Sequence, residues 1–148
     1  MEYKDILNDL APCGLSCRKC FANTEGDIPT LSAQLLERLG SFEIYAQRFS
    51  AFLPAFKEYP AFQGLLAYLA QGHCVGCRSG TCLYPNCGVA TCFRGKGADF
   101  CFQCDEFPCE KTNFDPHLER RWRQMNERMR EVGLEAYYEE TKDLPRYV

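Results

Sequence analysis

Eleven cysteines in 148 residues constrain this chain more than any other feature of its sequence. Eight of them fall between residues 73 and 109, and two of the gaps in that stretch are C-x2-C spacings. Such a spacing lets one tight turn direct two thiolates at a single tetrahedral ion, so metal ligation is the first hypothesis. All eleven are candidate metal ligands: Cys13, Cys17, Cys20, Cys74, Cys77, Cys82, Cys87, Cys92, Cys101, Cys104 and Cys109.

A disulfide scaffold is the main alternative, because small secreted proteins often carry many cysteines. The chain begins MEYKDILNDL, which lacks the apolar segment of a secretory signal. Neighbouring C-x2-C pairs make poor bridges, and an odd number of cysteines leaves one thiol over. No run reaches the roughly 18 apolar residues of a membrane span. We therefore expect a soluble, cytoplasmic, metal-binding protein.

The first three cysteines stand in CGLSCRKC, close enough together to bind one ion. Radical S-adenosylmethionine enzymes use the same spacing, but this chain is too short for their barrel. Three thiols need a fourth ligand, which we expect from the later stretch, at Cys82, Cys87, Cys92, Cys109 or His73. We also expect the knuckles Cys74/Cys77 and Cys101/Cys104 to share one ion, as in a zinc ribbon, although 23 residues separate them.

Residues 29–72 contain no cysteine and carry apolar residues at helical intervals. The pattern predicts one helix from Pro29 to Gly40, a second from Ser41 to Pro54 and a third from Pro60 to Gly72. Two stripes are expected to face a core: Leu31, Leu35, Leu36 and Leu39, then Phe62, Leu65, Leu66 and Leu69. An aromatic series is assigned to the same core rather than to a ligand groove: Tyr45, Phe49, Phe52, Phe56, Tyr59 and Phe62.

The cysteine-rich stretch has few large apolar residues and several glycines, which predict turns and at most short elements. A structural zinc site contributes about 10 to 16 kcal/mol of apparent binding free energy, so metal can replace the missing core. Asp115 is expected to cap a helix over 116–132, and a shorter helix is expected over 134–141.

The fold class that follows is mainly α, with a small helical bundle packed against an irregular cysteine-rich metal-binding lobe. We expect a single domain over 1–148. Its parts are the N-terminal cysteine trio at 12–28, a helical insert at 29–72, the metal lobe at 73–111 and C-terminal helices at 115–141.

Four motifs in order carry a resemblance to a known family: CGLSCRKC, GCRSG, CLYPNCGVATC followed by RGKG, and CFQCDEFPCEK. The chain resembles a functionally uncharacterised family of small cysteine-rich proteins of bacteria and archaea, a domain of unknown function with CGLxCxxC and CxxCxxFPCE motifs. The resemblance implies zinc binding and supplies no substrate. GVATCF departs from the family pattern, because Thr91 and Phe93 replace an expected basic residue and alanine.

Zinc is the expected metal, with an iron-sulfur cluster as the alternative, because all-cysteine ligands suit both. The spacings match neither ferredoxin pattern. We expect structural sites in an interaction or scaffold module with a protein partner still to be found, the alternative being an iron-sulfur redox or electron-transfer protein. Nucleic acid is disfavoured by the formal charge of −3, which bound thiolates make more negative.

Catalysis is not expected, although four residues are candidates for it. His73 could be a fourth ligand, His117 is placed in an exposed first helical turn, and Asp105 and Glu106 could serve a metal-bound water. Basic residues near the cysteines are expected to neutralise thiolate charge: Arg18, Lys19, Arg78, Arg94, Lys96 and Lys111.

Overall fold

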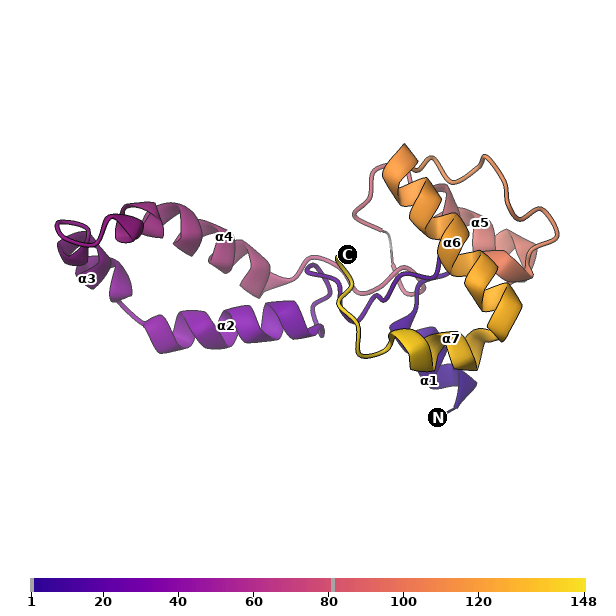
Figure 1. The fold of residues 1–148 in the computed structure, drawn as a ribbon, viewed down its shortest axis with the longest axis horizontal. Helices are drawn as coiled ribbons and strands as arrows, with labels where there is room; N and C mark the ends of the chain where they lie inside the picture. The colour runs from indigo at the N-terminus through magenta and orange to yellow at the C-terminus, as the bar shows by residue number, and fades with distance from the viewer. Residues whose placement is uncertain (1, 81) are drawn as a thin grey trace. The chain divides into compact units, whose positions relative to one another are not determined.

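The computed structural model describes residues 2–80 and 82–148, and within them the protein is mainly α, as expected. No β-strand and no helix long and apolar enough to cross a membrane occur in these two ranges. The helices, shown in Figure 1, are α1 (Tyr3–Asp9), α2 (Asp27–Leu39), α3 (Phe42–Phe49), η1 (Pro54–Glu58), α4 (Tyr59–Gln71), α5 (Gly88–Lys96), η2 (Cys101–Gln103), α6 (Pro116–Val132) and α7 (Leu134–Thr141).

The chain divides into two compact units. The cysteine-rich unit consists of residues 1–20 and 74–148, and the helical unit consists of residues 21–73. All eleven cysteines therefore belong to the first unit, although 53 residues of the second separate Cys20 from Cys74 in the chain.

The helical unit contains the three predicted helices, with α2 and α4 side by side as its main pair (Figure 1). Gly40 and Gly72 follow these two helices with φ of 53° and 62°, a conformation that glycine adopts without a steric cost. The second predicted helix is shorter than expected. It ends at Phe49, and a turn leads to η1 because Pro54 cannot continue the α-helical hydrogen bonds.

The predicted burial of this unit is wrong for many apolar side chains. Leu66 and Tyr59 are buried, but Leu31, Leu65 and Phe52 are 62%, 61% and 68% exposed. The physical reason is that a pair of helices offers each helix only one neighbour, so an apolar stripe wider than that contact remains outside. From the two leucine stripes and the aromatic series the exposed members are Leu31, Leu35, Tyr45, Phe52, Phe62 and Leu65.

The cysteine-rich unit has two small apolar clusters. In the first, Ile6 of α1 and Leu10, the C-cap of that helix, pack against Phe100 and against Met129 of α6. The second joins Ala11, Cys13, Val89, Phe107 and Trp122, with several other cysteines at its margin. Three of the five buried members, Cys13, Val89 and Phe107, stand in the cysteine motifs themselves.

The helix α5 is one element that the sequence analysis did not predict. Glycines at 88, 95 and 97 predicted turns, yet residues 88–96 are helical and Gly97 ends the helix in the left-handed conformation. Val89 and Ala90 are buried on its inner side, which offsets the low helix propensity of glycine. Gly88 is required at the start, because a Cβ there would lie 1.8 Å from the Lys111 carbonyl oxygen.

Candidate metal centre

Four thiols form a chain of sulfur contacts, which we call the first thiol group: Cys17, Cys77, Cys82 and Cys87. Hydrogen bonding from Cys77 lowers the pKa of Cys17 to about 6, and hydrogen bonds from Cys77 and Cys87 lower the pKa of Cys82 to about 2. The same bonds raise the pKa of Cys77 and Cys87. These hydrogen bonds join the four sulfur atoms in the order Cys17, Cys77, Cys82 and Cys87.

Backbone amides around this group point at sulfur atoms. Gly76 N–H donates to Cys74 Sγ at 3.3 Å, and Tyr84 N–H donates to Cys82 Sγ at 3.4 Å. Amide hydrogen bonds also lower the pKa of Cys13, Cys17 and Cys87. A peptide N–H that donates to sulfur favours the charged thiolate, which is the form that binds metal.

The other three cysteines near this group differ in their surroundings. Cys13 is 7% exposed inside the second apolar cluster, and burial raises its pKa to about 12. Cys20 accepts a hydrogen bond from the Tyr147 hydroxyl at 3.8 Å. Cys74 lies within electrostatic range of Cys17, Cys20 and Cys82, which raise its pKa after burial, the largest cause.

The C-terminal tail contributes a positive charge, that of Arg146, near the first thiol group. Arg146 lowers the pKa of Cys13, Cys17 and Cys82 by its charge, and its guanidinium donates to the Ser16 carbonyl oxygen. No sequence pattern indicates this role, since Arg146 is 59 residues beyond the nearest cysteine of the first thiol group.

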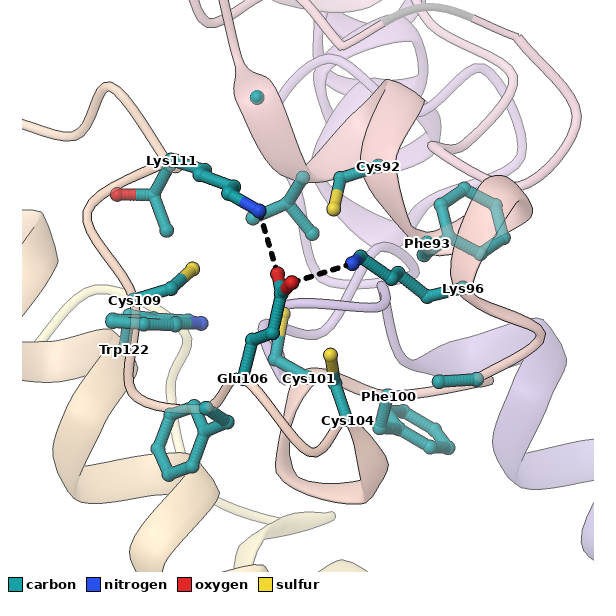
Figure 2. Close-up of a pocket in the computed structure, with 15 residues that line it drawn as sticks. Cys92, Phe93, Lys96, Phe100, Cys101, Cys104, Glu106, Cys109, Lys111 and Trp122 are labelled. Atoms are coloured by element: carbon teal, nitrogen blue, oxygen red, sulfur yellow. Dashed lines mark hydrogen bonds and ion pairs between the residues drawn. The ribbon is translucent and has the colours of Figure 1, made fainter.

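The second thiol group consists of Cys92, Cys101, Cys104 and Cys109, which line one cavity of about 40 Å³. In Figure 2 these four side chains surround one space, and they come from α5, η2, the C-cap of η2 and the loop after it. The neighbouring thiols raise the pKa of Cys101, although burial is the larger cause and brings it to about 11. The cavity has room for a few water-sized groups.

Trp122 of α6 forms one wall of this cavity. Its side chain is 1% exposed, and its Nε1–H is buried without a hydrogen-bond acceptor at normal geometry. The sulfur of Cys101 is the group with which the indole N–H interacts, and that contact lowers the pKa of the Cys101 thiol against the larger effect of burial. Phe107 packs edge-on against the indole with ring centroids 5.0 Å apart. From the sequence, Trp122 was expected only as part of the helix over 116–132, with no link to the cysteines.

Glu106 lies over the cavity between two lysines, as Figure 2 shows. Lys111 Nζ is 2.6 Å from Glu106 Oε2, and Lys96 Nζ is 2.9 Å from Oε1. Hydrogen bonds from the two ammonium groups lower the pKa of Glu106 to about 2, and Lys111 has the larger effect. The exposed carboxylate joins α5 to the loop after Cys109, and its oxygens are occupied by these two cations.

The two C-x2-C knuckles do not lie together, which corrects the expected zinc-ribbon pairing. Cys77 interacts with Cys17 and Cys82, whereas Cys101 and Cys104 lie with Cys92 and Cys109. Of the N-terminal trio, Cys17 contacts Cys77 of the later stretch, which is not one of the five expected fourth ligands, so the four-ligand site of the trio stays a prediction. The knuckles separate because α5 stands between them in the chain and carries Cys92 to the second group.

The basic residues beside the cysteines have other partners than thiolates alone. Arg78 donates to the carbonyl oxygens of Leu7, Leu10 and Asp99 at 3.0, 3.2 and 2.8 Å, and it lies 4.8 Å over the Phe100 ring. Lys19 donates to two carbonyl oxygens of the C-terminal tail. These side chains hold loops together. The negative charge of nearby cysteines also favours the protonated forms of Arg78 and Lys96.

The two histidines lie outside both thiol groups. His73 belongs to the helical unit, where its ring stacks on Tyr68 and its Nε2 is 3.3 Å from the Tyr68 carbonyl oxygen. His117 is exposed in the first turn of α6, as the sequence predicted.

No disulfide joins any of the eleven cysteines, all of which are described. Within residues 2–80 and 82–148, no three His, Cys, Asp or Glu side chains are arranged so that they could hold a metal ion as they stand. The two groups therefore bring candidate ligands into one neighbourhood without fixing a coordination geometry.

Residues 9–114 match the model of one protein family, described as "Protein of unknown function (DUF3795)". The match covers more than half of the chain and includes all eleven cysteines. The chain belongs to this family. Neither a curated protein nor a solved structure shows a significant match. Membership of the DUF3795 family agrees with the resemblance noted in the sequence, and it assigns no activity.

Proposed function

We propose that this protein binds zinc through cysteine thiolates at structural sites, and that the second thiol group is one of them. The observation that carries the proposal is the buried Nε1–H of Trp122, which has no acceptor at normal hydrogen-bond geometry and whose one neighbouring acceptor group is the sulfur of Cys101. A buried N–H without an acceptor costs roughly 1 to 3 kcal/mol. A metal-bound thiolate carries more negative charge than a thiol, so it would accept this bond far better.

The donor set of the second thiol group suits zinc. Zinc takes four cysteine sulfurs in structural sites, and a cavity of about 40 Å³ among four thiols suits a single ion. Cys92, Cys101, Cys104 and Cys109 would hold the ion, which would cross-link α5, η2 and the following loop when bound. Trp122 would donate to the sulfur of Cys101, and Glu106 would stay with its two lysines.

The first thiol group supports a second site. Cys17, Cys77, Cys82 and Cys87 already exchange hydrogen bonds, and backbone amides favour their thiolate forms. Cys20 and Cys74 lie near this group and could each replace one of its four ligands. We leave Cys13 out of this site because it packs in the apolar cluster with Trp122.

The wider function that we propose is that of a cytoplasmic interaction or scaffold module. Four thiolate ligands leave no open position for water or substrate, in contrast to catalytic zinc sites. Glu106, a carboxylate that lines the cavity, is paired with Lys96 and Lys111. These features favour a structural over a catalytic metal.

The test starts from full-length protein purified anaerobically with a thiol reductant. We expect zinc by elemental analysis, at two equivalents if both groups bind. Colourless protein supports zinc, whereas iron together with absorption near 400 nm would replace it by the iron-sulfur alternative. Protein that takes up neither metal would refute the proposal.

Trp122 is the only tryptophan and lines the cavity of the second thiol group, so its fluorescence should respond most strongly to zinc bound there. Adding zinc to metal-free protein should change this emission, and Cys104→Ser should abolish the change together with one equivalent of zinc. Cys82→Ser, in the first thiol group, should remove one equivalent while the emission response stays. Cys13→Ser is the matched control and should keep both equivalents.

A further inference from the structure

The cysteine-rich unit contains a second and larger cavity, which we call the basic cavity. It has a volume of about 250 Å³, and no cysteine lines it. Helix α7 packs against α1 and α6 (Figure 1), and the tail after α7 returns to the first cysteine motif. Residues of α6, of α7, of the tail and of the segment 9–19 together form its walls. All of them belong to the cysteine-rich unit.

Basic side chains hold the tail in place beside this cavity. Lys19 Nζ donates to two carbonyl oxygens of residues 141–144 at 2.9 and 2.8 Å. The guanidinium of Arg121 donates to the Arg146 carbonyl oxygen, and that of Arg146 donates to the Ser16 carbonyl oxygen. Because these acceptors are neutral, the bonds position the three side chains and leave their positive charges uncompensated.

Positive charge is in excess around the basic cavity. Four cations line it: Lys19, Arg121, Lys142 and Arg146. Lys142 has a carboxylate partner 2.6 Å away, but no ion pair of the other three occurs within residues 2–80 and 82–148. Asp9, the acidic residue of the lining, accepts a hydrogen bond from the Tyr138 hydroxyl. In a chain with a formal net charge of −3, such a concentration of cations in one cavity attracts an anion.

The thiols account for only part of this charge. Arg146 lowers the pKa of Cys17 and Cys82, so its charge is shared between the first thiol group and the basic cavity. Arg121 instead lowers the pKa of Tyr137, a buried residue of the cavity wall, against the larger effect of burial. The charge of Arg121 therefore reaches the wall of the cavity itself.

Much of the remaining lining is apolar. It includes Leu15, Met125, Tyr137, Leu144 and Pro145. An apolar wall with a few charged groups that fix the orientation of a ligand is the usual composition of a small-molecule site. The volume lies below the roughly 300 to 1,000 Å³ of sites for drug-sized ligands, so the cavity suits a small molecule.

We propose that the basic cavity binds a small organic phosphate. Lys19, Arg121 and Arg146 hold the phosphate group, and the organic part lies against the apolar wall. Arginine carries five N–H donors in a fork that matches phosphate oxygens, and only one donor of each arginine is used in the carbonyl bonds described above. A phosphate group, with a charge of about −1.5 to −2 at neutral pH, balances three unpaired cations better than a single carboxylate does. The inference does not rest on metal binding.

The first experiment is isothermal titration calorimetry of the full-length protein, as purified under reducing conditions, with three aromatic probes. Phenyl phosphate should bind at least about tenfold more tightly than benzoate, benzyl alcohol should bind more weakly than either, and inorganic phosphate should compete with phenyl phosphate. Benzoate that binds as tightly as phenyl phosphate would overturn the choice of a phosphate. If phenyl phosphate does not bind with a Kd below about 1 mM, the cavity is not a phosphate site.

The second experiment compares two neighbouring arginines of α6. Arg121→Gln should weaken the binding of phenyl phosphate by about 10- to 100-fold, because a charge-assisted hydrogen bond is lost. Arg120→Gln makes the same change of charge at an exposed position outside the cavity and should bind like wild type. Equal losses in the two variants, or unchanged binding by Arg121→Gln, would refute the site.

Arg121 also holds the tail, so a third variant separates binding from folding. Arg121→Lys keeps the positive charge and should lose less affinity than Arg121→Gln, while thermal unfolding of each variant shows whether the fold is retained. If Arg121→Gln loses the folded state, Lys19→Gln takes its place, with the same expected loss of about 10- to 100-fold. A folded Lys19→Gln variant that binds phenyl phosphate like wild type would contradict the proposed position of the phosphate group.

Discussion

The side-chain amide of Asn126 donates a hydrogen bond of 2.8 Å to the carbonyl oxygen of Cys13, 113 residues earlier in the chain. The same amide nitrogen donates to the Trp122 carbonyl at 2.9 Å, and its oxygen accepts from Phe102 N–H at 2.9 Å. Asn126 is fully buried. One side chain thus joins the N-terminal cysteine trio, α6 and η2, and it holds the two thiol groups to the same helix.

Removing the Asn126 amide should therefore destabilise the cysteine-rich unit. Asn126→Ala leaves a buried N–H and a buried carbonyl without partners and opens a cavity, so we expect the free energy of unfolding to fall by about 2 to 4 kcal/mol. Urea denaturation followed by Trp122 fluorescence measures the loss. Gln124→Ala, at an exposed position of the same helix, should change stability by less than about 0.5 kcal/mol. An equal effect of the two substitutions would contradict the role given to Asn126.

Two glycines of α5 give a matched pair for a second prediction. A Cβ at Gly88 would meet the Lys111 carbonyl oxygen at 1.8 Å, whereas a Cβ at Gly95 has open space around it. Gly88→Ala must push apart α5 and the loop that carries Cys109, which should cost about 2 kcal/mol or more. Gly95→Ala should instead stabilise the helix by about 0.5 to 1 kcal/mol. Thermal unfolding of both variants decides the matter: a tolerated alanine at 88 would mean that this contact does not constrain α5.

The sequence predicted the regular helices well because their ends are marked by strong local signals. Asp115 caps α6 and accepts from the N–H groups of His117 and Leu118, and Gly133 follows its last turn, as expected. Signals of this kind act over four residues and need no knowledge of the fold. Helix α5 could not be predicted in the same way, since it depends on the burial of Val89 and Ala90, and the need for glycine at 88 comes from the carbonyl of Lys111, 23 residues later.

The cap of α6 also predicts a pH dependence. Hydrogen bonds from Leu118 N–H and the Tyr84 hydroxyl lower the pKa of Asp115 below its usual value of 3.8. Because the folded pKa is the lower one, the cap stabilises the protein fully above the unfolded pKa and loses that contribution as the pH falls through the folded value. The urea midpoint of wild type should thus drop more steeply below about pH 4 than that of Asp115→Asn, which keeps an uncharged cap. If the urea midpoints of the two proteins fall in parallel with decreasing pH, Asp115 is not the source of the pH dependence.

The grouping of the cysteines was the harder part to predict. Spacing shows that Cys101 and Cys104 can share a turn, but it cannot show which other thiols the fold brings near them. That depends on α5, which carries Cys92, and on α6, which places Trp122 behind Cys101. The exposed Leu31, Phe52 and Leu65 could not be foreseen either, because a helical stripe looks the same whether its partner is the same chain or another.

Removal of bound metal should affect the two units differently. In the described parts of this stretch, residues 74–80 and 82–109, α5 and η2 are the only regular structure, and their core is shared with the thiol groups. We therefore expect these residues to lose amide protection when zinc is withdrawn by a strong chelator under reducing conditions. Helices α2 and α4 belong to the other unit, pack against each other and contain no cysteine. Hydrogen exchange read by mass spectrometry should therefore show faster exchange around Cys77 and Cys104, with α2 and α4 unchanged. Adding zinc back should restore the protection. If exchange around Cys77 and Cys104 stays the same after elemental analysis has verified the loss of metal, the thiol groups do not depend on an ion for their structure.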